Sequence, residues 1–400
     1  MPVPRFEPFR AIRYADDLVD IQQVVAPPYD VISPDRRARL MAIDPHNVVR
    51  IDLPDEADGP DRYDEAAVMF AAWRAEGVLR QDDEPAFYTY RMDLDDLAGH
   101  PVRTIGVLGA LELSRPGEGA ILPHEQTTPK AKSDRLDLLR STRANLSAIW
   151  GLSPVAGLTA LLHDPEPLAA WTGSDGTRHQ LGRIGDATQI AAIREAITAA
   201  PIVIADGHHR YETSLTYRDE RRNASADGTA GAAEDALVFV VELVESELTV
   251  LPIHRLIDEL PEATDLVAAL STHFDLHPVE IDARAIGVEM VHAGALCVVL
   301  PDRTYLAVPR AEAMIGVRDL DSSRLDAALA TVGPHRLRFQ HGVDNIVDAV
   351  RRGDAQAGVL LRPVRVPQIA EIAHGGERMP PKSTYFHPKP STGALFRTVD

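Results

Sequence analysis

The chain has 400 residues, which is more than one hydrophobic core usually spans, so we expect two or three lobes. Hydrophobic residues make up 45% of it, a normal share for a globular protein, and this argues against long disordered tracts. The formal net charge of -19 argues against a broad nucleic-acid or anionic-membrane surface, although it leaves room for a local basic pocket.

The single cysteine, Cys297, lies in the apolar run 295–300, which predicts a buried strand. A disulfide within the chain is excluded, and one thiol also argues against a zinc–cysteine site. Residues 1–6 lack the layout of a signal peptide, and no apolar stretch approaches the ~20 residues of a membrane helix. We therefore expect a cytoplasmic protein with neither a membrane nor a nucleic-acid partner.

The first part of the chain alternates apolar strands with amphipathic helices. A polar loop over residues 115–132 leads to Ser133, which we expect to be the N-cap of a helix. The remaining predicted elements are strands over 23–26 and 47–53, a helix over 62–76 and a hairpin over 87–111.

Further along, residues 201–205 predict a short buried strand, followed by a helix to about residue 222 and a second buried strand over 237–243. Beyond residue 260, apolar strands alternate with Ala-rich helices. We therefore predict a mixed α/β (α+β) fold with three parts. They are a main α/β body over residues 1–260, a smaller α+β lobe over 261–360 and a C-terminal segment, 361–400, that returns to the main body.

The strongest candidate site is the box Asp206-Gly207-His208-His209-Arg210 between that strand and helix. Glycine permits a sharp turn, and the first turn of a helix attracts phosphate, which Arg210 could bind in a bidentate way. Asp206 could hold Mg²⁺, and His208 and His209 suit acid–base work better than zinc, because neighbours on a helix point apart. In the alternative reading, Asp206 only caps the helix and the histidines are packed or solvated.

A second candidate is the polar loop before Ser133. Glu125 could accept a proton from a substrate hydroxyl, with Asp30 as the second choice for this base. Lys130 and Arg135 could contact phosphate, although a solvated surface loop explains the same residues about as well.

A third candidate is the aromatic and proline-rich stretch 379–390, which offers Lys382 and Lys389 to anions. Structural clamping of the tail against the body explains this stretch slightly better than ligand binding.

Several blocks together resemble a widespread bacterial and archaeal family of about this length, catalogued as a domain of unknown function. The resemblance covers nearly the whole chain, from Phe6 to Phe396. The blocks are residues 26–32, His124-Glu125, Asp134-Arg135, 205–211, 252–255 and 379–386.

The block of strand, Asp-Gly-His-His-Arg and helix is also similar to the phosphate-binding box of the ParB/sulfiredoxin superfamily. That superfamily includes partition-protein nucleotide switches, sulfiredoxins and free-serine kinases. The similarity implies a ParB-like lobe that binds ATP or ADP with Mg²⁺, in which Asp206, Gly207, His209 and Arg210 contact phosphates or the metal. The sulfiredoxin Gly-Cys-His-Arg pattern is absent, since Asp206-Gly207-His208 replaces it, so sulfiredoxin activity is not implied.

These features favour a nucleotide-dependent kinase that phosphorylates the hydroxyl of a small metabolite, with free L-serine as one candidate. A non-catalytic nucleotide-binding regulator and a phosphatase with a histidine acid remain alternatives. A metal hydrolase would use His124, His208, His209 and His254. A homodimer is compatible with the sequence, which does not fix the oligomeric state.

Overall fold

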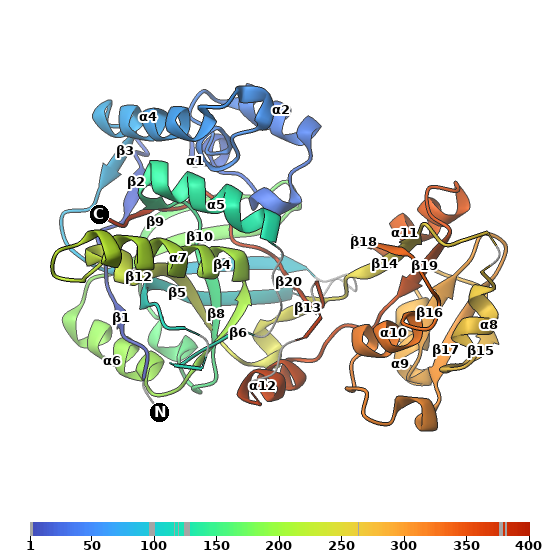
Figure 1. The fold of residues 1–400 in the computed structure, drawn as a ribbon. Coiled ribbons are helices and arrows are strands. Elements are labelled where there is room, and N and C mark those ends of the chain that lie inside the picture. Colours follow the sequence, from blue (N-terminus) through green and yellow to red (C-terminus); the bar gives the residue numbers. More distant parts are fainter. Residues whose placement is uncertain are drawn as a thin grey trace. The chain divides into compact units, whose positions relative to one another are not determined.

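The computed structural model describes residues 3–95, 101–115, 117–118, 120–123, 129–262, 264–375, 379–380 and 382–400. The chain forms two compact units, each described here by itself (Figure 1). The first unit comprises Met1–Thr249, Ala370–Glu377 and Phe386–Asp400, and the second comprises Val250–Ile369 and Arg378–Tyr385.

A nine-stranded mixed sheet forms the centre of the described part of the first unit. β11 runs parallel to β6, and β12 parallel to β8, while the other pairs of described strands in this sheet are antiparallel. The mixed α/β class is therefore confirmed, as is the predicted hairpin, which is the pair β4–β5. In order across the sheet, the strands are β6 (Ile121–Pro123), β11 (Ile202–Asp206), β8 (Ile149–Ser153), β12 (Asp235–Glu242), β5 (Pro101–Glu112), β4 (Phe87–Asp95), β10 (Arg178–Ile184) and β9 (Glu166–Thr172), with β1 (Phe6–Glu7) also on β5.

Helices cover this sheet, and α5 and α7 lie side by side (Figure 1). The helices of this unit are α1 (Ile21–Val24), α2 (Pro34–Ile43), α3 (Val49–Asp52), α4 (Arg62–Ala75), α5 (Pro129–Thr142), α6 (Ala187–Thr198) and α7 (His208–Ala224). Short strand pairs are β2 (Ile12–Tyr14) with β3 (Leu79–Gln81), and β7 (Ala144–Asn145) with β21 (Arg397–Thr398). The 3₁₀ turns are η1 (Tyr29–Val31), η2 (Glu56–Asp58), η3 (Thr159–Leu161), η4 (Gly231–Glu234) and η5 (Glu245–Glu247).

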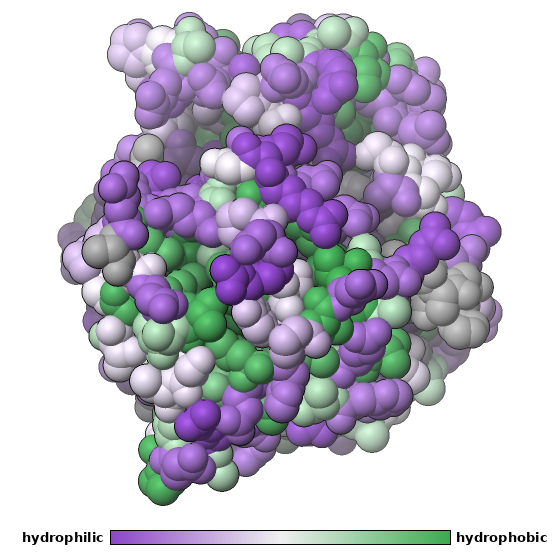
Figure 2. All heavy atoms as spheres, turned by 90° about the vertical axis from the view of Figure 1, so that its right-hand side faces the viewer, coloured by the Kyte–Doolittle hydropathy of each residue, from purple (hydrophilic) through white to green (hydrophobic). Residues whose placement is uncertain are grey.

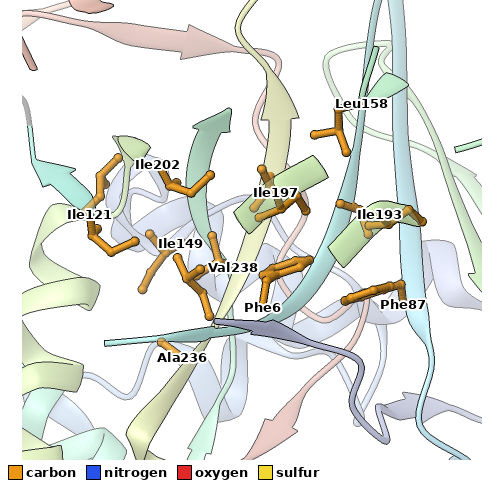
Figure 3. Close-up of a cluster of buried hydrophobic side chains, with 14 of the residues drawn as sticks. Phe6, Phe87, Ile121, Ile149, Leu158, Ile193, Ile197, Ile202, Ala236 and Val238 are labelled. Atoms are coloured by element: carbon orange, nitrogen blue, oxygen red, sulfur yellow. The ribbon is translucent and has the colours of Figure 1, made fainter. Parts of the chain in front are cut away.

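A cluster of aliphatic and aromatic side chains packs around β1 (Figure 3). Phe6 is fully buried, and its ring stacks on that of Phe87 with centroids 5.0 Å apart. Ile193 and Ile197 bring α6 into the same cluster, while Val238 brings in the sheet. Ile202 and Ile204 of β11 also belong to this cluster, so the cluster holds in place the strand that ends at Asp206.

Two predicted strands are wrong, because residues 23–26 and 47–53 belong largely to the helices α1 and α3. Their β-branched side chains suggest strands, but tertiary packing overrides that local preference. Val48, Val49 and Ile51 are buried in a core shared with α4.

Asn47 explains why the chain turns into a helix at this point. Its side-chain oxygen accepts a hydrogen bond from the Val49 N–H (3.1 Å), as a helix cap does. Its side-chain nitrogen donates to the Gln23 carbonyl (2.7 Å), which ties α3 to α1.

The helix predicted to begin after Ser133 already begins at Pro129, four residues before that serine. Proline suits the first helical position because its fixed φ matches a helix and its missing N–H is not needed there. Ser133 therefore lies inside α5 instead of capping it.

The described part of the second unit is built on a six-stranded antiparallel sheet with a core on each face. Val298 faces one core, and its neighbours Cys297 and Val299 face the other, as strand alternation requires. In sheet order, the strands are β15 (Phe274–Pro278), β17 (Thr304–Pro309), β16 (Leu296–Val299), β19 (Ala357–Leu360), β14 (His254–Asp258) and β18 (Arg336–Gln340). The helices are α8 (Leu266–Leu270), α9 (Ile286–Ala293), α10 (Asp321–Leu329) and α11 (Val343–Arg351), with the turn η6 (Ala311–Met314). Three elements, β13 (Thr249–Leu251), α12 (Val366–His374) and β20 (Tyr385–His387), lie where the chain passes between the units.

Cys297 is fully buried in β16, as the sequence predicts. Burial raises the pKa of its thiol to about 12, so the reactive thiolate is scarce at neutral pH.

Large apolar side chains are mostly buried, with a few exceptions on the surface. On the second unit, Val288, Val291, Ile315 and Phe339 are exposed. Figure 2 shows a face on which apolar residues gather in patches among polar ones. Throughout the described ranges, no helix has the length and apolar character needed to cross a membrane.

Gly109 provides a test of the packing around β1. A Cβ atom at this position would lie 2.6 Å from Cε1 of Phe6, so the ring would have to move. We expect Gly109→Ala to lower the free energy of unfolding by about 1–3 kcal/mol, measured by urea denaturation. Gly287→Ala is the control, since it meets no atom within 4 Å and should be neutral or slightly stabilising. Equal effects of the two changes would contradict this account of the core.

Candidate functional site

The predicted strand and helix around the Asp206 box are confirmed. β11 ends at Asp206, and α7 begins at His208. Gly207 joins them with φ 86° and ψ 27°, a left-handed conformation that glycine adopts without steric cost. A Cβ atom on residue 207 would lie 3.0 Å from atoms of the Arg210 guanidinium. The glycine therefore lets the guanidinium fold back against the turn.

Asp206 is held between two cations. Its Oδ1 accepts a hydrogen bond from the Lys389 ammonium (2.7 Å), and its Oδ2 accepts one from Nη2 of Arg210 (2.8 Å). Arg210 also donates to the Ala148 carbonyl, so its guanidinium is fixed at two points. All three charged side chains are largely buried, which strengthens the electrostatic interactions between them.

Lys389 also brings Asp30 into the cluster. Its ammonium lies 3.3 Å from Oδ2 of Asp30, which belongs to η1, and only 7% of the lysine side chain is exposed. Two carboxylates, Asp30 and Asp206, thus share one ammonium. Asp30 is the more exposed of the pair, with 30% of its side chain accessible against 23% for Asp206.

A second group of side chains surrounds Arg135 of α5. Its guanidinium lies over the Tyr29 ring, 4.3 Å from the centroid, in cation–π geometry. Nη1 donates to the Asp52 carbonyl (2.7 Å), and Nε donates to the Asp134 carboxylate (2.8 Å). Tyr29 precedes Asp30, so the two groups meet at η1.

Burial governs the titration of this second group. Burial raises the pKa of the Asp52 carboxyl, and the nearby Arg135 and Arg210 offset this only in part. The pKa of Tyr29 is also raised by burial. In both groups, therefore, burial outweighs the stabilising effect of the nearby arginines on the charged form.

Arg210 separates two pockets of the first unit. Four residues line both of them: Leu146, Ser147, Arg210 and Leu237. Asp52 and Arg135 complete the charged lining of one pocket, while Asp206 and Lys389 complete that of the other. The box thus faces two cavities, as a site for a ligand with two distinct parts would.

The two histidines of the box occupy the first turn of α7. His208 is buried, with 8% of its surface exposed, and His209 is half-buried. Both stand beside the Gly207 turn, where the positive end of the helix dipole lies.

The remaining predicted site residues either lie outside the described residues or belong to the second unit. Glu125 and His124 lie outside the described residues, and so does the side chain of Lys130, whose backbone begins α5. Lys382 belongs to the second unit, where it is exposed.

His254 also belongs to the second unit, within β14. Its Nδ1 accepts a hydrogen bond from the Leu361 N–H (3.2 Å), and burial first, then the neighbouring His341 and Arg255, lower its pKa to about 4. Among the residues with described positions, no three His, Cys, Asp or Glu side chains gather to hold a metal ion.

The sequence did not single out Asp52, and it indicated Lys389 only as one of two anion contacts in the C-terminal stretch. The sequence offered Lys389 as an anion contact equal to Lys382, and nothing distinguished the two. One signal was present, since Lys389 lies between Pro388 and Pro390, which restrict the backbone on both sides. Asp52 had no such signal, because its region suggested an ordinary strand.

Comparison with solved structures finds three proteins whose chains resemble this one over most of their length. A free serine kinase variant in complex with AMP has a TM-score of 0.41 and 11% identity, over 70% of this chain and 88% of that one. SbnI from Staphylococcus aureus, truncated at its C-terminus, has a TM-score of 0.39 and 10% identity, over 70% and 82%. A conserved hypothetical protein from Pyrococcus furiosus has a TM-score of 0.37 and 10% identity, over 67% and 87%.

No curated protein matches the sequence. A family model does match it, and the match extends over residues 6–327, which is most of the chain. The chain therefore belongs to the family described as protein of unknown function (DUF1015).

Proposed function

We propose that the first unit binds a nucleotide at the Asp206 box and transfers its terminal phosphoryl group to the hydroxyl of a small metabolite. The observation that carries this proposal is the placement of Asp206 between Arg210 and Lys389 at the start of α7. Phosphoryl transfer depends on neutralising phosphate charge and orienting the reacting groups more than on covalent chemistry by the protein.

Arg210 and Lys389 are the cations that would contact phosphate. Nε of Arg210 is buried and has no hydrogen-bond partner among the described atoms, so a phosphate oxygen would satisfy it. The start of α7 adds the positive end of a helix dipole, in the way that many phosphate sites do.

Asp206 is the carboxylate of the cluster that would hold a divalent cation, while Asp30 is left to accept a proton. Mg²⁺ prefers oxygen ligands and is often held by one or two carboxylates together with the phosphates of a nucleotide. Asp206 and Asp30 already share one positive charge, the Lys389 ammonium. When bound, Mg²⁺ would offset the charge that develops on the transferred phosphoryl group.

Asp30 is the described carboxylate best suited to act as the general base. Asp30 and Asp206 both contact the Lys389 ammonium, and Asp30 is the more exposed of the two carboxylates. A substrate hydroxyl could therefore reach Asp30 from solvent. Glu125 remains the other proposed base. Free L-serine is the acceptor that we would test first, because of the resemblance of the box to that of the free-serine kinases.

Nucleotide binding is the first prediction. We expect ATP and ADP, with Mg²⁺, to bind the purified protein with micromolar affinity in calorimetry. Lys389→Ala and Arg210→Ala should each weaken the affinity about 10- to 100-fold, because each removes a charge-assisted contact to phosphate.

Arg115→Ala is the matched control for these variants. Arg115 is an exposed arginine that pairs with Asp219 (2.6 Å), and its loss should leave the affinity unchanged. The proposal fails if the wild-type protein binds no nucleotide, and phosphate esters without nucleotide would then be tested as substrates.

Turnover is the second prediction, and it separates a kinase from a non-catalytic regulator. We expect Asp30→Asn to lower kcat about 100-fold or more, because the amide cannot accept the proton of the acceptor hydroxyl. Nucleotide affinity should change little, which calorimetry on the same sample would check.

Asp17→Asn serves as the control, since Asp17 forms an exposed ion pair with Arg80 (2.8 Å). A full rate in Asp30→Asn would exclude Asp30 as the base and direct attention to Glu125. Nucleotide binding without transfer to any of the hydroxylated metabolites tested would favour the regulator.

A further inference from the structure

The segment Phe386–Asp400 returns to the first unit and carries Lys389 into the site. Aromatic packing holds the segment on one side of Lys389, where the Phe386 and Trp150 rings have centroids 5.5 Å apart. Two further contacts hold it on the other side, at Ser391. Lys389 therefore lies on a short stretch of chain fixed at both ends.

Ser391 is held by two buried aromatic residues of the central sheet. Its N–H donates to the hydroxyl of Tyr90 in β4 (2.9 Å), and its Oγ accepts a hydrogen bond from Nε1 of Trp171 in β9 (3.2 Å). Tyr90 and Trp171 also pack edge to face, with centroids 5.8 Å apart. Both contacts lie two residues beyond Lys389, so they limit where its side chain can reach.

His179 in β10 fixes the orientation of the Tyr90 hydroxyl. Its Nδ1 lies 3.0 Å from the Tyr90 oxygen, and its ring stacks on Trp171 at an angle of 11°. Burial lowers the pKa of His179 to about 4, so the ring is neutral near pH 7 and Nδ1 can accept a hydrogen bond from the Tyr90 hydroxyl. The Tyr90 oxygen is then left to accept from Ser391.

A backbone contact sets the segment opposite the turn that contains Asp30. Thr392 and Ala26 exchange both backbone hydrogen bonds, at 2.8 and 3.1 Å. The pairing is antiparallel, so the chain running back from Thr392 towards Lys389 passes the chain running forward from Ala26 towards Asp30. This pairing brings Lys389 close to Asp30.

We infer that Tyr90 and Trp171 are positioning residues, which hold Lys389 against Asp206 through Ser391. The role of Lys389 in binding phosphate rests on the proposed function, but its placement does not. Placement can be measured directly, because a lysine with 7% of its side chain exposed should react slowly with an acylating reagent.

The experiment measures the rate at which acetic anhydride labels Lys389 in the full-length protein, by mass spectrometry. Labelling of the exposed Lys382 provides an internal reference. We expect Tyr90→Phe to raise the relative rate at Lys389 about tenfold, because the Ser391 N–H loses its acceptor and the segment opens more often. Ser391→Ala, a milder change that keeps the bond from the Ser391 N–H to Tyr90, should raise it by less.

Tyr88→Phe is the matched control. Tyr88 also lies in β4, is fully buried, and uses its hydroxyl to accept from the Ala11 N–H (3.1 Å) and to bond Asp82 (2.6 Å). Its loss removes a comparable buried hydroxyl without touching Ser391, so the labelling rate of Lys389 should not change.

The inference would be overturned if the labelling rate of Lys389 were unchanged in both Tyr90→Phe and Ser391→Ala. It would also be overturned if Lys389 were labelled at the same rate in Tyr90→Phe and in Tyr88→Phe. If Lys389 becomes more reactive as expected but the wild-type protein binds no nucleotide, the positioning role stands and the proposed function fails. If nucleotide does bind, Tyr90→Phe should weaken its affinity and Tyr88→Phe should not.

Discussion

The site depends on one carboxylate, Asp206, which is bound at each of its oxygens by a different cation. Arg210 comes from the first turn of the helix that follows, α7, whereas Lys389 lies 183 residues away in the chain. A buried carboxylate is costly unless it is paired, and here the pairing joins the two segments that build the site. Asp206 is therefore a structural link between α7 and the C-terminal segment as well as a candidate ligand-binding group.

The site gathers positively charged side chains, although the protein as a whole is acidic. The chain carries a formal net charge of -19, yet Arg135, Arg210 and Lys389 gather within the first unit. Arg135 is paired with Asp52, and Arg210 and Lys389 are both paired with Asp206. A protein with an acidic net charge can thus still present a local group of cations to a small anion.

The sequence predicted the parts of this site that depend on local structure. An apolar strand, a glycine and a helix mark the Asp206 box, because these elements are specified by neighbouring residues. It did not distinguish Lys389 from Lys382, since the ion pairs of Lys389 with Asp206 and Asp30 join residues that are far apart in the chain. The helix within residues 47–53 was missed for a related reason. The side chain of Asn47 accepts from the nearby Val49 N–H, but it also donates to the carbonyl of Gln23, which is distant in sequence.

The distance along the chain between Asp206 and Lys389 also affects how the protein is made. A growing polypeptide contains β11 and α7 long before Lys389 leaves the ribosome, so any pairing of Asp206 with Arg210 during synthesis forms without the third partner. During that interval, Asp206 keeps one cation instead of two. A nascent or prematurely terminated chain would thus contain the whole box and yet lack the lysine, and the family match, which ends at residue 327, would still identify it.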